Sequence, residues 1–328
     1  MRTITLMHAI VYGNSGVLKL EEIDKPHPAD DEVLLKVRAA SVNPLDYHFS
    51  KHPFLRPVMA RVSKVKTLRP GRDVAGQVEA VGNNVKQFKA GDEVFGACNG
   101  AFAEYACGRE SAFVIKPGNV SFVQAASVPV AGLTALQGFR DKAQLERGQK
   151  VLINGAAGGV GTFAVQIAKT FGAEVTGVCS TRNVELVRSI GADTVIDYTR
   201  EDFTCNGKQY DLIFDLVANH SFAEQRRVLT RTGIYIGAGM IGLGGSMIRV
   251  LRRLITELVE RPFVSQKSMN LMAKLTQKDL DTLGLLIAEG KVTPVIDRHY
   301  RLSEVPDAVR YLEQGHARGK VIIDLDNS

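Results

Sequence analysis

The chain has 328 residues, of which 45% are hydrophobic and 23% are charged, with a formal net charge of +6. This length predicts two domains, and no apolar run reaches the roughly 18 residues of a transmembrane helix. The basic residues are dispersed, which disfavours nucleic acid as a partner and favours a small ligand that carries phosphate.

The first part of the chain, residues 7–125, is rich in short β-type segments separated by turns. The segment MRTITLMHAIVYG lacks the long apolar core of a signal peptide and predicts an ordinary first strand. Further predicted strands are EVLLKVRAASV, VAGQVEAVG, DEVFGAC and FAEYACG. Because no helical pattern separates them, they predict an antiparallel, barrel-like β-rich domain.

From about residue 126 the pattern changes to alternating helices and strands. VQAASVPVAGLTALQGF predicts a helix that Pro129 kinks or breaks. The strands that follow are KVLIN, EVTGVCS, TVIDY, YDLIFDLVA and IYIGAG, and the helices include GTFAVQIAKTFG, NVELVRSIG and HSFAEQRRVLTRTG. Nearly all-apolar strands that alternate with helices predict a parallel sheet covered on both faces.

The last part of the chain returns to the β-rich style. A basic amphipathic helix over 247–260 comes first, followed by a possible edge strand within PFVSQKSMN and a helix that Gly290 ends. VTPVIDRHY and KVIIDL then predict strands. We therefore expect a Rossmann-type domain over 125–272, inserted into a β-rich domain formed by 1–124 and 273–328. The basic helix predicts either a lid over a substrate pocket or a membrane contact.

The four cysteines, Cys98, Cys107, Cys179 and Cys205, have no metal-ligand spacing such as CxxC. Free buried thiols in a reducing compartment are the simplest interpretation, and we expect a cytoplasmic protein.

The glycine-rich stretch NGAAGGVG spans residues 154–161, between a predicted strand and a predicted helix. Closely spaced glycines in this context let the backbone approach a pyrophosphate at a helix N-terminus. Gly158 and Gly161 match the second and third glycines of GxGxxG, and Ala156 stands in place of the first. The alternative is a turn that only packs helix on strand. The predicted cofactor contacts are Ala156, Ala157, Gly158, Gly159, Val160 and Gly161.

The next strand ends in Ser180-Thr181-Arg182 and has no carboxylate at its end. NAD sites usually place an Asp or Glu there for the ribose hydroxyls, whereas hydroxyls and a guanidinium suit a 2′-phosphate. These three residues therefore predict NADPH rather than NADH, although Ser180 also fits a helix cap. Tyr198, at the end of the following strand, is expected near the adenine.

With these residues identified, the chain resembles the medium-chain dehydrogenase/reductase superfamily, in its zinc-free quinone oxidoreductase (zeta-crystallin-like) branch. The matching segments are SVNPLD, GRDVAGQVEAVG, GDEVFG, GAFAEY, AGLTALQG, NGAAGGVGTFAVQIAK, GADTVIDY and GKVII. The resemblance covers about residues 8–324 and implies a GroES-like β-rich domain that carries a Rossmann domain.

The resemblance implies that no metal is bound. Asn43 stands in the place of the first cysteine ligand of the zinc alcohol dehydrogenases, and Arg72 in the place of the histidine. An amide oxygen is a poor zinc ligand and a guanidinium is permanently cationic. Without a metal to assist removal of an alcohol proton, hydride transfer to an electron-poor acceptor is the expected reaction.

The resemblance also assigns the remaining site residues. It places Asn43 and Asp46 beside the nicotinamide, with Tyr47 as a proton donor or substrate contact. Near the cofactor it places Thr134, Gly237, Ala238 and Lys320. Structural alternatives stay open: a turn role for Asn43, core packing for Tyr47, a helix-facing hydroxyl for Thr134 and a solvated position for Lys320.

The predicted function is NADPH-dependent transfer of hydride to a quinone or an α,β-unsaturated carbonyl. The alternatives are an enoyl-thioester reductase, an alcohol dehydrogenase and a non-catalytic NADPH-binding protein. The expected partners are a small-molecule substrate and a second copy of the chain, with contact through the edge strand near Phe263. Neither nucleic acid nor stable membrane insertion is expected.

Overall fold

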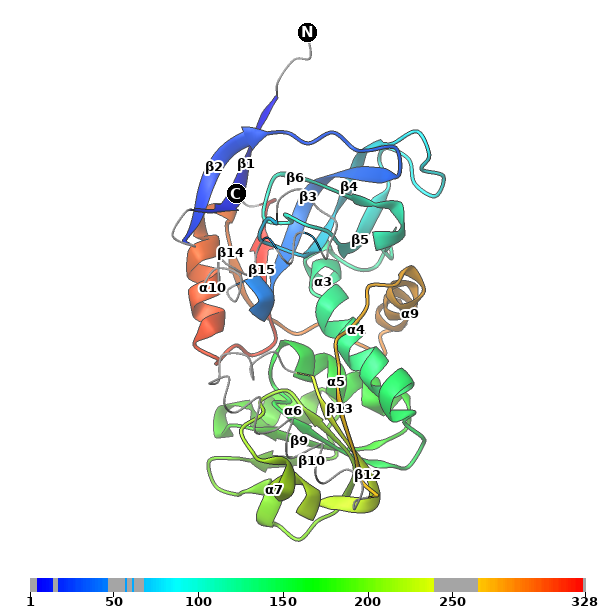
Figure 1. Cartoon of the computed structure of the whole chain (residues 1–328), viewed down its shortest axis with the longest axis vertical. Coiled ribbons are helices and arrows are strands. Elements are labelled where there is room, and N and C mark those ends of the chain that lie inside the picture. Colours follow the sequence, from blue (N-terminus) through cyan, green and yellow to red (C-terminus); the bar gives the residue numbers. More distant parts are fainter. Residues whose placement is uncertain are drawn as a thin grey trace. The chain divides into compact units, whose positions relative to one another are not determined.

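The computed structural model describes residues 5–13, 17–46, 57, 61, 68–238 and 265–326. The chain divides into two compact units (Figure 1). Unit 1 comprises Met1–Leu133, Leu275–Gly290 and Pro294–Ser328, and unit 2 comprises Thr134–Lys274 and Lys291–Thr293. The finer domain bounds expected from the sequence stay a prediction. Tyr47 and the basic helix over 247–260 lie outside the described residues.

Unit 1 is built on a seven-stranded sheet with the order β14-β15-β3-β4-β5-β7, and β6 also pairs with β3. Its strands are β3 (Glu32–Val42), β4 (Asp73–Val81), β5 (Glu93–Ala97), β6 (Tyr105–Arg109), β7 (Phe113–Ile115), β14 (Ile296–Tyr300) and β15 (Lys320–Asp324). A separate hairpin is formed by β1 (Leu6–Tyr12) and β2 (Leu18–Asp24). The pairings are antiparallel as predicted, except that β14 and β15 run parallel.

The central strand β3 explains why this sheet forms one core. Val33, Leu35 and Val37 alternate along β3 and pack with Val74 of β4 and Val321 of β15 in one buried cluster. Strand β4 comes unusually close to β3 at Gly76, where an added Cβ would lie 2.3 Å from the carbonyl oxygen of Lys36. Glycine is therefore required at this crossing.

Four named α-helices lie at least partly in the described residues of unit 1, besides a helical turn at residues 44–46. They are α3 (Phe122–Ala126), α4 (Pro129–Gln137), which begins in unit 1 and ends in unit 2, α9 (Gln277–Ala288) and α10 (Val305–Glu313). The predicted break at Pro129 is confirmed, because α3 ends before it and α4 starts on it. A capping box between Ser121 and Gln124 begins α3, and Gly290, with φ of 69°, follows the end of α9.

Unit 2 is a six-stranded parallel sheet with the order β10-β9-β8-β11-β12-β13. Its strands are β8 (Lys150–Asn154), β9 (Glu174–Cys179), β10 (Thr194–Asp197), β11 (Tyr210–Asp215), β12 (Leu229–Gly237) and β13 (Lys267–Asn270). The helices between them are α5 (Gly159–Thr170), α6 (Val184–Ser189) and α7 (Phe222–Arg227) (Figure 1). This is the predicted doubly wound Rossmann sheet, with the predicted edge strand at β13.

The strand order reverses between β8 and β11, because the chain winds outward from β8 to β10 and then returns to the other side of β8. In open α/β sheets, ligands bind outside the carboxyl ends of the strands at such a switch point. The topology of unit 2 therefore selects the ends of β8 and β11 as the place to look for a site.

One predicted helix is too long. The segment HSFAEQRRVLTRTG was expected to be helical throughout, but α7 ends at Arg227 and β12 begins at Leu229. The capping box of Ser221 and Glu224 fixes the start of α7, and Leu229 already pairs with Tyr210 of β11. Strand pairing thus overrides the helical periodicity of this segment.

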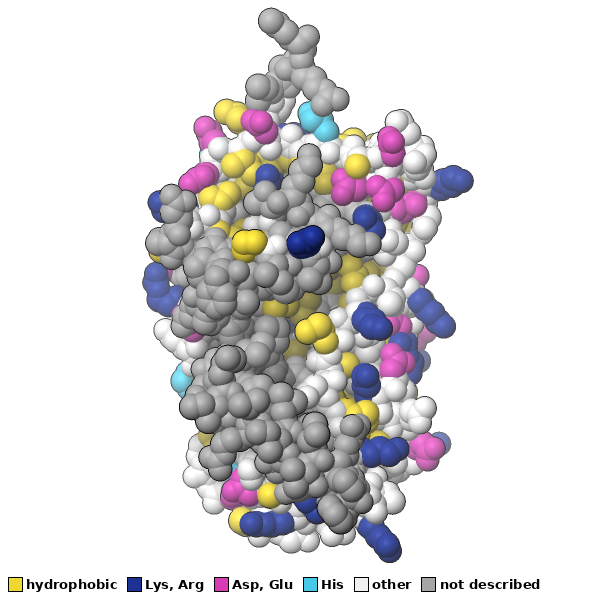
Figure 2. All heavy atoms as spheres, viewed as in Figure 1, with side chains coloured by type: hydrophobic (Ala, Val, Ile, Leu, Met, Phe, Trp, Pro, Cys, Tyr) yellow, Lys and Arg dark blue, Asp and Glu magenta, His cyan; other side chains and the backbone are white. Residues whose placement is uncertain are grey.

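Within the described part of the chain, no helix is both long and apolar enough to cross a membrane. On the face drawn in Figure 2, the Lys and Arg side chains of the described residues are interspersed with Asp and Glu. This distribution agrees with the dispersed charge of the sequence.

Candidate functional site

The carboxyl ends of the central strands of unit 2 are aligned. Asp215, the last residue of β11, pairs in register with Asn154 at the end of β8 and with Gly237 at the end of β12. The turns that follow these three strands therefore begin at one edge of the sheet, at the switch point.

The turn after β8 is shaped by two glycines with different roles. Gly155 has φ of 90°, in the left-handed region that favours glycine. At Gly161, inside α5, an added Cβ would lie 2.1 Å from the carbonyl oxygen of Gly155, so only glycine lets the helix come this close to the turn. In the GxGxxG pattern, Ala156 stands at the position of the first glycine. In the structure, the tight-turn role belongs to Gly155, one residue earlier.

The predicted contact residues of this turn are not equivalent. The amides of Gly155 and Ala156 both donate to the carbonyl oxygen of Val178, and the side chains of Ala156 and Ala157 are buried. The amide of Ala156 therefore holds the turn, and its proton is directed to Val178. Gly158 is the N-cap of α5 and has no side-chain cap, so the first-turn amides at Gly159–Gly161 keep no intrahelical acceptor.

The space beside Gly158 is suited to a ligand. An added Cβ there would meet one neighbour within 4 Å, the carbonyl oxygen of Gly155 at 3.4 Å. Amide donors, the positive end of the dipole of a 12-residue helix and a glycine without a side chain together fit a phosphate group. The residues present therefore fit the pyrophosphate of a dinucleotide.

Asp215, which the sequence analysis did not single out, links the two turns at the switch point. Its Oδ1 accepts from Asn154 Nδ2 at 2.9 Å and from the amides of Val217 and Ala218 at 3.0 Å each. Its Oδ2 accepts from Gln225 Nε2 at 2.8 Å and from the Tyr235 hydroxyl at 2.9 Å. A carboxylate that ends an otherwise apolar strand was the available signal in the sequence.

The other predicted residues of unit 2 have the following positions. Gly237 ends β12 and Ala238 follows it; both are half-buried, and the amide of Ala238 donates to the carbonyl oxygen of Asp215. Thr134 is buried on α4. Val160 lies half-buried in the first turn of α5.

The turn after β9 brings hydroxyls and charges together. Thr181 and Arg182 are exposed, and Tyr198, after the neighbouring strand β10, is 57% exposed. The sequence showed no carboxylate at the end of β9, but the structure brings one from β10. Asp197 pairs with Cys179 in register, and the Thr181 hydroxyl donates to Asp197 Oδ2 at 2.6 Å. That hydrogen bond is the main cause that lowers the pKa of Asp197.

A buried acceptor without a donor lies in the same turn. Asn183 is 7% exposed; its Nδ2 donates to Ser180 Oγ at 3.2 Å, and its Oδ1 has no hydrogen-bond partner among the described residues. Ser180 therefore acts as a hydrogen-bond acceptor and not as the helix cap considered above. An unsatisfied buried acceptor is costly, and a ligand with hydroxyl or amino groups would offset that cost.

Unit 1 contains a buried polar network around Asn43. Lys320 Nζ donates to Asn43 Oδ1 at 2.8 Å and lies 3.3 Å from Asp73 Oδ2. Asn43 Nδ2 in turn donates to Asp73 Oδ2 at 3.0 Å. Asp73 Oδ1 accepts from the amide of Val130 at 3.0 Å, in the first turn of α4. Lys320 is 3% exposed, so the solvated alternative for this lysine is wrong.

Asp46 joins this network through the backbone. Its two oxygens accept from the amides of Asn43 at 2.8 Å and Gly71 at 3.0 Å, which ties the turn at 43–46 to the loop before β4. Burial raises the pKa of Asp46 to about 6, against the lowering effect of the two amides. The negative charge of Asp73 also raises this pKa, and Lys320 lowers it.

Asn43 and Arg72 stand where the zinc alcohol dehydrogenases have metal ligands. Asn43 is engaged on both amide atoms by Lys320 and Asp73, and the ammonium beside its oxygen would repel a cation. Arg72 is half-buried, and its carbonyl oxygen accepts from the amide of Cys98. Among the described residues, no group of three or more His, Cys, Asp and Glu side chains has metal-site geometry.

The cysteines are free. Burial raises the pKa of both Cys98 and Cys107 to about 12, so these thiols are protonated and unreactive at neutral pH. The expectation that all four are buried is wrong for Cys205, which is exposed, and for Cys107, which is half-buried.

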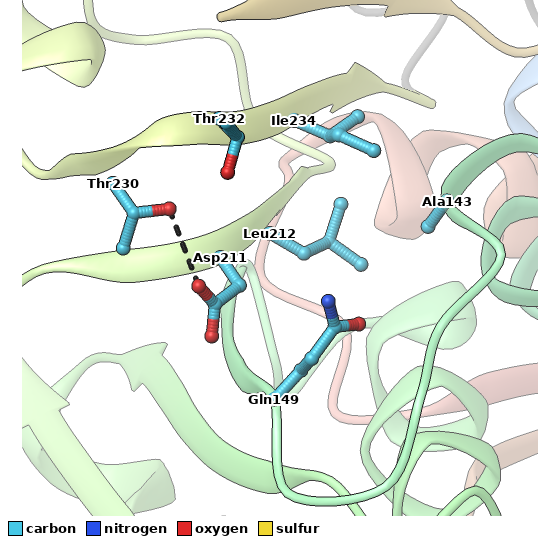
Figure 3. Close-up of a pocket in the computed structure, with 7 residues that line it drawn as sticks. All are labelled: Ala143, Gln149, Asp211, Leu212, Thr230, Thr232 and Ile234. Atoms are coloured by element: carbon cyan, nitrogen blue, oxygen red, sulfur yellow. Dashed lines mark hydrogen bonds between the residues drawn. The ribbon is translucent and has the colours of Figure 1, made fainter.

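A small cavity lies at the opposite edge of the sheet of unit 2. It has a volume of about 50 Å³ and is lined by Ala143, Gln149, Asp211, Leu212, Thr230, Thr232 and Ile234 (Figure 3). The Thr230 hydroxyl donates to Asp211 Oδ1 at 3.2 Å across one wall. Ligand pockets are typically several hundred Å³, so this cavity is too small for a dinucleotide.

Two family models match the chain. Residues 29–119 match the alcohol dehydrogenase GroES-like domain, and residues 190–323 match the zinc-binding dehydrogenase model. The chloroplast envelope quinone oxidoreductase homolog of Arabidopsis thaliana is 36% identical, over 97% of this chain and 98% of that protein. The chloroplastic NADPH-dependent alkenal/one oxidoreductase of the same plant is also 36% identical, over 95% of this chain and 77% of that protein.

The fold has close counterparts among solved structures. The quinone oxidoreductase from Coxiella burnetii superposes with a TM-score of 0.85 at 32% identity, over 98% of this chain and 100% of that one. The CurK enoyl reductase superposes with a TM-score of 0.84 at 26% identity, over 97% and 99% of the two chains.

Proposed function

We propose that this chain, which belongs to the quinone oxidoreductase branch of the medium-chain dehydrogenase/reductase superfamily, is an NADPH-dependent reductase of quinones or α,β-unsaturated carbonyls. Its relatives carry the names of both kinds of reductase. The supporting observation is the turn from Gly155 to Gly161 at the switch point of the parallel sheet. Its proposed cofactor contacts are Ala157, Gly158, Gly159, Val160 and Gly161, and Ala156 holds the turn through its bond to Val178.

The preference for NADPH rests on the turn after β9. Ser180 and Arg182 follow β9 where an NAD-dependent enzyme usually has an acidic residue. The neighbouring carboxylate of Asp197 accepts hydrogen bonds from Thr181 and Thr199, which compensate part of its charge. The orphaned Asn183 Oδ1 suits a donor on the ribose or the adenine. The exposed ring of Tyr198 offers a stacking surface for the adenine.

The reaction requires few protein groups. NADPH supplies a hydride when it is bound. The chain binds the dinucleotide and orients the acceptor. The enolate or hydroquinone monoanion that forms holds the new charge within the substrate itself, and one proton from water or a side chain completes the product. Thr134, Gly237, Ala238 and Lys320 are proposed to lie on the nicotinamide side, with Asn43 and Asp46. Tyr47 stays a candidate proton donor or substrate contact.

Zinc independence belongs to the same proposal. The matched family model is named for zinc binding, but Asn43 already accepts from an ammonium at 2.8 Å and is not available as a metal ligand. Elemental analysis of the purified chain is the direct measurement. One tightly bound zinc per chain would contradict the proposal.

A substrate panel with the purified full-length chain tests the function. NADPH oxidation is followed by absorbance with a benzoquinone, a naphthoquinone, an alkenal and an alkenone, and NADP⁺ reduction is followed with a primary alcohol. We expect turnover with at least one quinone or enone and none with the alcohol. Turnover only with a crotonyl thioester would favour an enoyl-thioester reductase. Binding of NADPH without any turnover would favour a non-catalytic protein.

The remaining expectations concern assembly and location. A homodimer and a cytoplasmic location stay predictions; several relatives are named as chloroplastic or mitochondrial proteins. Sedimentation equilibrium of the purified chain would measure its oligomeric state, and a monomer at micromolar concentration would contradict the dimer.

A further inference from the structure

Thr181 was assigned to the 2′-phosphate on sequence grounds, but its hydroxyl proton has another acceptor. Thr181 Oγ1 donates to Asp197 Oδ2 at 2.6 Å, and the Thr199 hydroxyl donates to Asp197 Oδ1 at 2.8 Å. A hydroxyl has one proton to donate. A phosphate oxygen accepts but does not donate at neutral pH, so Thr181 can contact it only after breaking a short, charge-assisted bond to Asp197.

The Ser180 hydroxyl, unlike that of Thr181, acts as a hydrogen-bond acceptor. Its Oγ accepts from Asn183 Nδ2 at 3.2 Å, so the Ser180 proton is directed away from that amide. The backbone around it is extended, and the side chain is half-buried. Ser180 is thus a hydroxyl of this turn with a proton to offer to a phosphate oxygen.

The structure adds a cation that the sequence analysis left out. Arg200 follows β10, its Nε lies 3.7 Å from Asp197 Oδ2, and its side chain is 78% exposed. The same Asp197 oxygen accepts from Thr181, in the turn that continues into Arg182. A guanidinium therefore lies at the wall of this turn, positioned by an ion pair with the carboxylate that would otherwise repel a phosphate.

We propose that Arg200 is a specificity-determining residue of the 2′-phosphate subsite, together with Ser180 and Arg182, and that Thr181 does not contact the phosphate. Asp197 is then a positioning residue, because its Oδ2 accepts the Thr181 hydroxyl and also pairs with Arg200. This inference rests on the proposed use of NADPH and names residues that discriminate it from NADH.

The test compares cofactors with and without the 2′-phosphate by isothermal titration calorimetry. The probes are NADP⁺ and 2′,5′-ADP against NAD⁺ and 5′-AMP, with wild type, Arg200→Gln and Thr181→Val. The matched control is Arg188→Gln, because Arg188 is also exposed and paired with a carboxylate three residues away, Glu185, in the same unit. Thermal melts check that each variant is folded.

We expect Arg200→Gln to weaken NADP⁺ and 2′,5′-ADP about tenfold and to change NAD⁺ and 5′-AMP less than about twofold, as expected for one charge-assisted contact. Arg188→Gln should change neither. Thr181→Val should weaken NADP⁺ and 2′,5′-ADP less than Arg200→Gln does, because it removes a hydrogen bond to Asp197 and no contact to the phosphate. The inference is overturned if Arg200→Gln weakens the ligands with and without the 2′-phosphate equally or not at all, or if Thr181→Val weakens NADP⁺ as much as Arg200→Gln does. A wild-type chain that binds NAD⁺ as tightly as NADP⁺ overturns the proposed cofactor instead.

Discussion

The ammonium of Lys320 lies 2.8 Å from the amide oxygen of Asn43, and both side chains are almost entirely buried. Strand β15 thereby supplies the cation that compensates Asp73, on β4. Removal of one partner from a buried ion pair leaves an uncompensated charge, which is more costly than the loss of the contact itself.

Lys320→Met should therefore lower the free energy of unfolding by about 3–5 kcal/mol, measured by urea denaturation at neutral pH. Lys116→Met is the matched control. Lys116 is also buried, but its partner Glu93 is 47% exposed and stays hydrated when the lysine is lost. We expect Lys116→Met to lower the free energy of unfolding clearly less than Lys320→Met does. Equal losses would mean that the buried charge of Asp73 is not what makes Lys320 necessary.

Asp46 predicts a pH dependence with a defined sign. Because its pKa is raised from 3.8 to about 6, the folded chain holds a proton between these pH values that the unfolded chain releases. The stabilising contribution is complete below the unfolded value and is lost as the pH rises through about 6. The difference in free energy of unfolding between wild type and Asp46→Asn should therefore fall by about 3 kcal/mol over this window and then stay constant.

Asp92 serves as a control, because its effect on the free energy of unfolding should change with pH in the opposite direction. Hydrogen bonds from Lys89 lower the pKa of Asp92, so its contribution is present at neutral pH and is lost as the pH falls. The free energy of unfolding of wild type minus that of Asp92→Asn should therefore rise as the pH increases in the acidic range. A wild-type minus Asp46→Asn difference that also rises with pH would refute the buried-carboxyl interpretation of Asp46.

Substitutions at Gly158 and Gly161, in the proposed pyrophosphate turn, should affect stability and cofactor binding differently. In Gly161→Ala the new Cβ meets a carbonyl oxygen at 2.1 Å, so we expect about 1–3 kcal/mol of destabilisation together with weaker binding. In Gly158→Ala the nearest atom is at 3.4 Å, and the melting temperature should change little. Because the pyrophosphate is common to both cofactors, Gly158→Ala should weaken NADPH and NADH to the same extent, measured by calorimetry. Unchanged binding in Gly158→Ala would exclude this turn as the cradle.

Charge reversal at Arg182 tests the cofactor preference independently of Arg200. Arg182 is exposed, so Arg182→Glu should fold normally. We expect the KM for NADPH to rise at least tenfold, because the new carboxylate repels the 2′-phosphate, and the KM for NADH to change little. Steady-state kinetics with both cofactors on one acceptor provide the measurement. Parallel changes in the two KM values would count against a 2′-phosphate at this turn.

Much of the fold was accessible from the sequence because its signals are local. The all-apolar strands of unit 2, the glycine turn at 154–161 and the break at Pro129 each depend on a few neighbouring residues, and the family resemblance added their order. The prediction of a helix that continues into β12 was wrong because Leu229 pairs with Tyr210. Hydrophobic periodicity reports only on neighbouring residues and cannot reveal a strand partner that is distant in the sequence.

The site was less predictable because its contacts are long-range. Lys320 meets Asn43 and Asp73 only after β15 has paired with β3, and Asp197 reaches Thr181 because β10 lies beside β9. The glycine fingerprint predicted a turn between a strand and a helix, which the structure has, but it did not predict the positive φ at Gly155, one residue before Ala156. An acidic residue at the end of a strand, such as Asp197 or Asp215, was the signal available.

The pairing of β15 with β3 also sets an order of assembly during synthesis. When the ribosome has made the chain as far as residue 274, unit 2 lacks only the short stretch Lys291–Thr293, whereas the sheet of unit 1 still lacks β14 and β15. Until Lys320 emerges, Asp73 lacks the ammonium that lies 3.3 Å from its Oδ2 in the folded chain, so burial of this carboxylate costs more free energy. We therefore expect unit 2 to fold first on the nascent chain, and the final segment to complete unit 1, whose first strands are translated earliest.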